Sequence, residues 1–297
     1  MKKMTKFFAL ALLAGAMVSC STEDIAPSTQ NDKVAVQFTG GISVNTRAAG
    51  LAWADGDKIG IFMTGTKQPL SADAIQEGVD NICYQTSGSI GFSPVSGGKT
   101  VFFPIDGDVD FYSYYPQTTV NDYKVALDVT YQTKQEAIDF MYAKTEGCNK
   151  ATPQVFLKFY HKLSNLVLDV QPGNGLTQED LKKMTVTVKG QNTKATFNLA
   201  DGTISGEGNP TDIKMKTTQA GKLYEAILLP TEEASRVIEF DLNNGYDAPF
   251  VWTMPAKLEG GNRYHYTVVK LSRSAVEISG TIKPWTEAGD NNEHVAQ

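Results

Sequence analysis

The sequence predicts an all-β protein made of two tandem β-sandwich domains. Residues that favour strands and turns are abundant, with 26 Gly, 12 Tyr and 14 Phe, whereas the Ala, Leu, Lys and Glu blocks typical of helices are scarce. Runs in which apolar and polar residues alternate recur about every ten to fifteen residues, with turn residues between them. The 297 residues are enough for two ordinary domains.

Composition argues against several classes of function. A formal net charge of −6, without a basic patch interleaved with aromatic residues, argues against a nucleic-acid partner, because phosphate contacts need clustered Lys and Arg. No Cys or His pair has the spacing of metal ligands, and no acid, base and nucleophile form a recognisable set. We therefore expect no cofactor and no enzymatic activity. Cys83 and Cys148 are expected to be two separate buried thiols, and the alternative is that they pair in an oxidising compartment.

Residues 1–19 have the features of an export signal. Three lysines, at positions 2, 3 and 6, precede an apolar run over 7–18 that is too short for a comfortable membrane span. Small residues then lead directly to Cys20, an arrangement that resembles the lipobox of bacterial lipoproteins. Cys20 is therefore the expected lipid-attachment residue, and the alternative is an ordinary signal peptide with an incidental cysteine.

Residues 20–33 predict a polar tether that holds the folded protein away from a membrane. Glu23 and Asp24 lie close behind the cysteine, which resembles the signal that sends lipoproteins to the outer surface, although any polar tether would look similar. The following Pro, Ser, Thr, Gln and Asn residues favour a flexible linker.

The first strand is predicted over 34–47. Its alternation is interrupted at Gly40-Gly41 and then resumes, and the strand ends on Arg47. The side chains expected to face the core are Val34, Val36, Phe38, Ile42 and Val44. A basic residue at this end either closes a turn or marks the Arg47–Ala48 bond at which a protease removes the strand.

The other elements of the first domain, residues 34–150, follow in order. Asp55-Gly56-Asp57 and Asp106-Gly107 are turn signals that precede alternating segments. Strands are expected at 59–63, 82–85, 90–92, 101–104, 109–116, 125–129 and 139–143. The stretch 146–150 is the predicted boundary between the two domains.

The second domain, residues 151–297, continues the same pattern. Thr177 and Asp180 have the spacing of a cap on one helical turn, and Asp201-Gly202 is a hairpin signal. Strands are expected at 155–163, 166–170, 184–188, 195–199, 203–204, 223–230, 236–240, 250–252 and 264–269. A last strand covers 275–285, where Val276, Ile278 and Ile282 share one face and Gly280 leaves a gap on it.

Several residues allow both a structural and a functional interpretation. His161 lies on an alternating strand without a nucleophile motif, which favours a packed histidine over a catalytic one. The turn 106–110 has carboxylates at alternate positions, as calcium loops do, but it lacks the downstream Glu of an EF-hand, so a solvated turn is favoured. The three tryptophans are expected to be core anchors rather than sugar-stacking platforms: Trp53, Trp252 and Trp285.

Several short motifs follow the export signal in a fixed order. They are Asn45-Thr46-Arg47-Ala48, Trp53 with Gly56-Asp57, Ile59-Gly60-Ile61-Phe62, Phe159-Tyr160-His161-Lys162-Leu163-Ser164, Leu228-Leu229-Pro230, Gly260-Gly261-Asn262-Arg263-Tyr264-His265-Tyr266 and Ile282-Lys283-Pro284-Trp285. Each motif alone is weak, but their order extends across nearly the whole chain. Together they resemble the motifs of the fimbrillins, type V pilins and related surface adhesins of Bacteroidales.

The resemblance implies two transthyretin-like β-sandwiches in tandem and assembly by strand exchange. In family members that polymerise, an arginine-specific protease cuts after an arginine like Arg47, and the first strand leaves. Removal of this strand exposes an apolar groove and unpaired sheet edges in the remaining domain. A C-terminal strand of the next subunit then fills the groove. The resemblance therefore assigns Val34, Val36 and Phe38 to the groove, and it makes the strand with Val276, Ile278 and Ile282 a candidate donor.

The resemblance also implies an outer-membrane lipid anchor, other fimbrial subunits as partners, and host or bacterial surface ligands. Only a short polar tail follows Trp285, so the strand 276–282 is either the donor or the last strand of its own domain. The short tail favours a tip or accessory subunit. The alternative is a non-polymerising surface lipoprotein that binds a glycan or a host protein through exposed aromatic residues.

Overall fold

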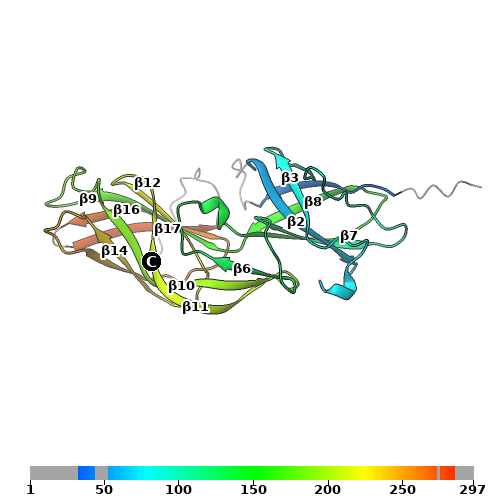
Figure 1. Cartoon of the computed structure of the whole chain (residues 1–297). Helices are drawn as coiled ribbons and strands as arrows, with labels where there is room; N and C mark the ends of the chain where they lie inside the picture. The colour runs from blue at the N-terminus through cyan, green and yellow to red at the C-terminus, as the bar shows by residue number, and fades with distance from the viewer. Residues whose placement is uncertain (1–32, 44–52, 273–274, 285–297) are drawn as a thin grey trace, which may run out of the picture. The chain divides into compact units, whose positions relative to one another are not determined.

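The computed structural model describes residues 33–43, 53–272 and 275–284, and these are almost entirely β (Figure 1). The prediction of an all-β protein is confirmed. The helical segments in the described ranges are two short 3-10 turns, η1 at Ala72–Ala74 and η2 at Gln135–Ala137. Within the same ranges, no helix has the length and apolar character needed to cross a membrane.

The first sheet closes on itself as a barrel, in the strand order β1-β4-β3-β2-β5-β7-β8. Its strands are β1 Gln37–Ile42, β2 Asp55–Gly65, β3 Ile82–Ser87, β4 Gly91–Pro94, β5 Val109–Tyr115, β7 Met141–Cys148 and β8 Gln154–His161. Neighbours pair antiparallel except β1 and β8, which run parallel and close the barrel. Alternation along single strands does not predict this closure, because sandwiches and barrels share the same period of two.

Two five-stranded sheets make up the rest of the fold. The first contains β6 Lys124–Asp128, β10 Thr185–Asn198, β11 Thr203–Lys214, β14 Arg236–Asp241 and β15 Phe250–Met254. The second contains β9 Ser164–Pro172, β12 Lys216–Gln219, β13 Leu223–Leu228, β16 Asn262–Ser272 and β17 Ala275–Pro284. Inward residues of both sheets belong to one apolar cluster, as expected for packed sheets.

Strand β5 is buried along its whole length. Phe111 packs inside the barrel, whereas Tyr112 and Tyr114 belong to the apolar cluster that the two five-stranded sheets share. The Tyr114 ring stacks on Phe140, with ring centroids 6.0 Å apart, and Phe140 contacts Phe197 of β10 at 4.7 Å. A strand with apolar neighbours on both faces reads as a nearly continuous apolar run, which is what VDFYSYY is.

The sheets do not divide at residue 150, where the sequence predicts the domain boundary. β7 pairs with β8 across that point, at Met141↔His161 and Tyr142↔Tyr160. β6, from the first half of the chain, pairs with β10 over five residues. The chain therefore contributes β6 to a sandwich sheet before β7 and β8 complete the barrel, and the division into two domains at 150 stays a prediction.

Both halves contain one parallel strand pair that joins an early strand to a late one. In the barrel this pair is β1 and β8, and in the sandwich it is β9 and β16. β17 follows β16 and pairs with it antiparallel at the edge of its sheet. Relative to the barrel, which ends with β8, β17 is an added strand.

Cys83 on β3 and Cys148 on β7 are free thiols, each half-buried, so the prediction of separate thiols is confirmed. Burial, with the nearby carboxylates of Asp110 and Asp108, raises the pKa of Cys148 to about 11. A thiol with a raised pKa is a poor nucleophile, which agrees with a packing role.

Candidate functional site

The first strand occupies a slot in the barrel wall between β8 and β4. Its register with β8 covers all six residues of β1, whereas its register with β4 covers two. Just upstream, the Val36 N–H donates to the Val101 carbonyl at 2.9 Å, and the Phe103 N–H donates to the Val34 carbonyl at 2.9 Å. The slot is therefore built from segments that lie far from β1 in the sequence.

Two inward side chains anchor this strand. Val36 is 5% exposed and Phe38 is 2% exposed. The Phe38 ring lies edge-on to Tyr84 and Phe111, with centroid distances of 5.3 and 5.1 Å. Val34 is half-buried against the same cluster. Ile42 is also half-buried against that cluster, so four of the five residues that the sequence assigns to this face lie together, and Val44 lies outside the described residues.

Gly40 is required by the rings on either side of it. A methyl group added at Gly40 would lie 2.8 Å from Cε2 of Phe92 and 3.2 Å from Cε2 of Phe159, and both rings are buried. The Gly40 carbonyl accepts a hydrogen bond of 2.9 Å from Nε1 of Trp53. Trp53 in turn packs edge-on against both phenylalanines, at 5.1 and 5.2 Å. The slot therefore has no room for a side chain at this position.

The outer face of the strand is more permissive. A methyl group on Gly41 would lie 2.8 Å from Cζ of Phe156, but this ring is 53% exposed and can turn into solvent. The Thr39 hydroxyl donates to the Val155 carbonyl at 3.5 Å, and the Gln154 amide donates to Oε1 of Gln37 at 3.3 Å. Substitutions on this face change exposed contacts rather than the core.

Replacing Trp53 with Phe is expected to lower the free energy of unfolding by about 1–2 kcal/mol, because the Gly40 carbonyl loses its donor while most ring packing remains. For a chain of this size, that shift corresponds to about 2–6 °C in the thermal midpoint, measured by circular dichroism. Trp252→Phe is the matched control, since Trp252 is half-buried and packs on Tyr266 of β16, away from β1. An equal shift in both variants would contradict a specific role for Trp53.

Two of the sequence motifs meet near the end of the barrel. The Gly261 N–H donates to the Leu163 carbonyl, and the Ser164 hydroxyl donates to the Glu259 carbonyl, both at 2.8 Å. A methyl group on Gly260 would lie 2.5 Å from the Lys162 carbonyl oxygen. His161 is 5% exposed and its Nδ1 lies 2.8 Å from the Asp139 carboxylate, so it is a packed residue, as predicted.

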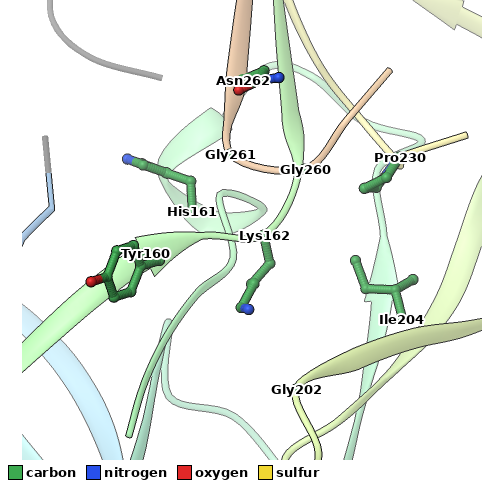
Figure 2. Close-up of a pocket in the computed structure, with 9 residues that line it drawn as sticks. All are labelled: Tyr160, His161, Lys162, Gly202, Ile204, Pro230, Gly260, Gly261 and Asn262. Atoms are coloured by element: carbon green, nitrogen blue, oxygen red, sulfur yellow. The ribbon is translucent and has the colours of Figure 1, made fainter. Parts of the chain in front are cut away.

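A cavity of about 560 Å³ opens where these motifs meet (Figure 2). Lys162 extends into it, and its ammonium lies 5.3 Å from the Tyr142 ring centroid and 5.8 Å from that of Phe197. Burial lowers the pKa of Lys162. The two rings offer the cation an electrostatic partner in this cavity.

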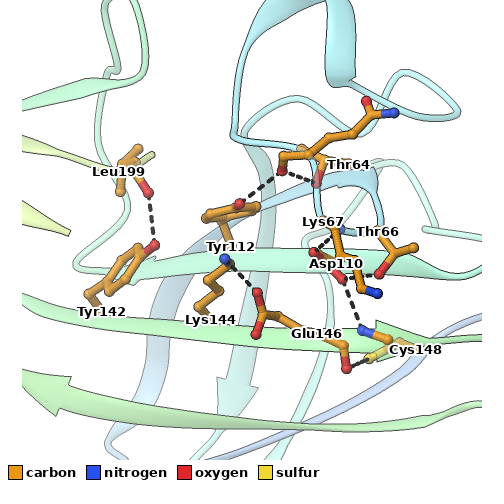
Figure 3. A network of polar contacts seen from close by, with 12 residues as sticks. Thr64, Thr66, Lys67, Asp110, Tyr112, Tyr142, Lys144, Glu146, Cys148 and Leu199 are labelled. Carbon is orange, nitrogen blue, oxygen red and sulfur yellow. Dashed lines mark hydrogen bonds and ion pairs between the residues drawn. The ribbon is translucent and has the colours of Figure 1, made fainter. Parts of the chain in front are cut away.

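Asp110 on β5 is a fully buried carboxylate (Figure 3). It accepts hydrogen bonds from the Thr66 hydroxyl at 3.0 Å, the Lys67 N–H at 2.8 Å and the Gly147 N–H at 2.9 Å. These donors come from the segment after β2 and from β7, so Asp110 ties three barrel strands together. Its oxygens face donors, which supports the structural interpretation of the acidic turn over a cation site.

The other predicted site residues have different outcomes. Cys20, Arg47 and Ala48 lie outside the described residues. Val276, Ile278 and Ile282 lie on β17, which pairs with β16 of the same chain, so the structure does not bring them to the first strand. Trp53 is a buried anchor, as predicted, and Trp252 is half-buried. Trp285 lies outside the described residues.

Sequence reasoning missed the tryptophan bond to Gly40, the buried Asp110 and the cavity around Lys162. An acidic residue inside the apolar run VDFYSYY was the signal for Asp110, since a buried carboxylate must find donors. Residue spacing gives no signal for the tryptophan bond or for the cavity, because the residues that form each of them are distant in sequence.

Comparison with known proteins identifies relatives of this chain. The profile of a family described as "Fimbrillin-like" matches residues 46–285. A Bacteroides uniformis protein whose name describes it as a fimbrium subunit, Fim1C, is 33% identical over 301 residues, which cover 95% of this chain and 96% of that protein.

Two crystal structures extend the comparison to the fold. A Bacteroides uniformis protein described as a cell adhesion protein has 32% sequence identity and a TM-score of 0.73, over 86% of this chain and 99% of its own. A Bacteroides ovatus protein with the same description has 25% identity and a TM-score of 0.68, again over 86% and 99% of the two chains. Both similarities cover the barrel and the sandwich together.

Proposed function

Because the chain belongs to the fimbrillin-like family, we propose that it is a structural, tip or accessory subunit of a surface fimbrium that takes part in cell adhesion. Its partners are other fimbrial subunits, bound by exchange of the first strand for a strand of a neighbour. The relatives described as a fimbrium subunit and as cell adhesion proteins support this role.

The slot of β1 is the observation that carries the proposal. The strand closes a barrel whose other six strands come from residues 55–161, and it is joined to them through residues 44–52, which contain Arg47. A cut after Arg47 leaves the strand held by main-chain pairing and a few inward side chains. Its loss would open an apolar groove between two strand edges, which is the arrangement that β-strand addition requires.

The export route completes the proposal. Cys20 carries the lipid, the protein reaches the outer surface of the outer membrane, and an arginine-specific protease then cuts the Arg47–Ala48 bond. The sequence pattern around Cys20 and the position of Arg47 after the strand support these steps.

Replacing Arg47 with Lys in the bacterial host tests the proposal and keeps the positive charge. We expect the wild-type protein recovered from the cell surface to begin at Ala48 and to run as polymers, because the open groove accepts a strand. The R47K protein should begin at lipidated Cys20 and stay monomeric, because an arginine-specific protease spares lysine. N-terminal sequencing and native mass measurement distinguish the forms. Polymers of protein that still begins at Cys20 would contradict the cleavage step.

A second candidate function, a glycan-binding surface lipoprotein that keeps its first strand, is favoured by the outer face of β8. Phe156 and Tyr160 are 53% and 46% exposed, and the Lys158 ammonium lies 5.2 Å from the Tyr160 ring centroid. Specific binding of the uncut chain to a glycan array, lost in the Tyr160→Ala variant, would support this function over polymerisation.

A further inference from the structure

The first and last strands have the same sequence pattern. Segment 35–42 reads AVQFTGGI and segment 275–282 reads AVEISGTI. Four of the eight positions are identical, namely Ala, Val, Gly and Ile at the first, second, sixth and eighth places. Three of the other four differ conservatively, as Gln37 against Glu277, Phe38 against Ile278 and Thr39 against Ser279.

The two segments agree most closely at the positions of β1 whose side chains face the inside of the barrel. The inward positions Val36 and Phe38 are buried, and the last strand has Val276 and Ile278 at the equivalent places. Gly40, which the buried rings of Phe92 and Phe159 keep free of a side chain, corresponds to Gly280. The pattern therefore repeats at the positions where the slot is restrictive.

The outward positions vary as the slot allows. Thr281 corresponds to Gly41, where the ring that a side chain would meet is the exposed one of Phe156. Ser279 has a hydroxyl like that of Thr39, which donates to the Val155 carbonyl, and Glu277 has acceptor oxygens like Oε1 of Gln37, which accepts from Gln154. The polar groups of β1 that bond to β8 thus have equivalents in the last strand.

β17 is the edge strand of its own sheet, and β16 is its one strand neighbour in that sheet. Ser279 and Thr281 pair with Val268 and His265 across a register shift of β16, so Gly280 also lies opposite an irregularity in its own sheet.

We propose that the slot of β1 selects an incoming strand by a glycine at the position of Gly40, and that it takes segment Ala275–Ile282 of a second copy of this chain in the register of Ala35–Ile42. This inference rests on the proposed strand exchange and adds to it the register of the incoming strand and the residue that selects it. The contact is heterologous, because the β1 slot of one copy holds the last strand of another, and such contacts build open filaments when the rotation between copies does not close into a ring.

Four substitutions in the full chain test the register without any cleavage. The variant Q37E/F38I/T39S/G41T gives the first strand the sequence of the last one. Because the slot accepts this pattern, we expect a soluble monomer whose thermal midpoint lies within about 6 °C of the wild-type value.

The matched control exchanges the glycine and the serine of that variant. Q37E/F38I/T39G/G40S/G41T has the same composition but places a Cβ against Phe92. We expect its midpoint to fall at least about 10 °C below that of the four-substitution variant, because a buried ring must shift. Equal midpoints for the two variants would overturn the glycine selection, and failure of the four-substitution variant to fold would overturn the shared register.

Binding in trans tests the occupant and separates this inference from the proposed function. The chain cut after Arg47 and freed of its first strand is titrated with peptides 33–45 and 273–285, and with the latter after exchange of Ser279 and Gly280. We expect both native peptides to bind and the exchanged peptide to bind at least about tenfold more weakly. Binding of 33–45 without 273–285 would refute the occupant alone, whereas binding of neither would refute strand exchange itself.

Discussion

Removing the first strand is expected to lower the free energy of unfolding by about 5–9 kcal/mol at most, because Val36 and Phe38 lose full burial and Val34 and Ile42 lose partial burial. Domains of ordinary size are stable by about 5–15 kcal/mol, so the barrel without β1 should be close to unfolding. This marginal state is what would make a replacement strand bind strongly.

Calorimetry on three forms of the chain measures this effect. The intact protein and the protein cut after Arg47 but still holding its strand should have similar midpoints, since the same contacts persist. The form from which the strand has been separated should melt well below both and bind a dye that reports exposed apolar surface. The emission of Trp53, which is 5% exposed and bonded to Gly40, should shift to longer wavelength when the strand leaves.

Adding back peptide 33–47 should restore the midpoint and the emission of Trp53. The cut form that retains its strand is the control for the break in the chain itself. If the separated form melted within about 2 °C of the intact protein, the strand would contribute little to the barrel and the proposed exchange would lose its driving force.

Alternation along the chain predicts the strands and their inward faces well. β8 and the inward residues of β1 follow it, because each has one buried and one solvated face. It is less informative at β5, where both faces are buried, and at the expected strand 101–104, where the structure has an isolated bridge between Phe102 and Ala35. The alternation of apolar and polar residues indicates which face of a strand is buried, but it does not indicate which strand pairs with it.

The residues of the β1 slot also differ in how well the sequence predicts their roles. Val36 and Phe38 could be assigned from their own spacing, because apolar side chains at alternate positions of a strand share a face. The requirement for glycine at position 40 could not, because the rings that impose it come from residues 92 and 159. β6 illustrates the same limit on topology, since its pairing with β10 joins segments about seventy residues apart.

Replacing Asp110 with Ala is expected to lower the free energy of unfolding by about 3–5 kcal/mol, because a buried carboxylate loses three hydrogen bonds at once, from the Thr66 hydroxyl and the Lys67 and Gly147 N–H groups. Asp110→Asn keeps the shape and one acceptor oxygen but turns an amide toward a donor. It should therefore cost less than Asp110→Ala, about 1–3 kcal/mol. Urea unfolding followed by circular dichroism gives both values.

Asp108→Ala is the matched control two residues away. Asp108 is exposed and its carboxylate accepts a hydrogen bond of 3.0 Å from the Asn149 amide, so loss of this side chain should cost less than about 0.5 kcal/mol. Asp110 joins β2, β5 and β7, which lie on the far side of the barrel order from the β1 slot. We therefore expect Asp110→Ala to prevent the strand-depleted form from refolding around a new strand, even when the intact variant still folds. Equal stability of the Asp110→Ala and Asp108→Ala variants would show that the three donors find other acceptors.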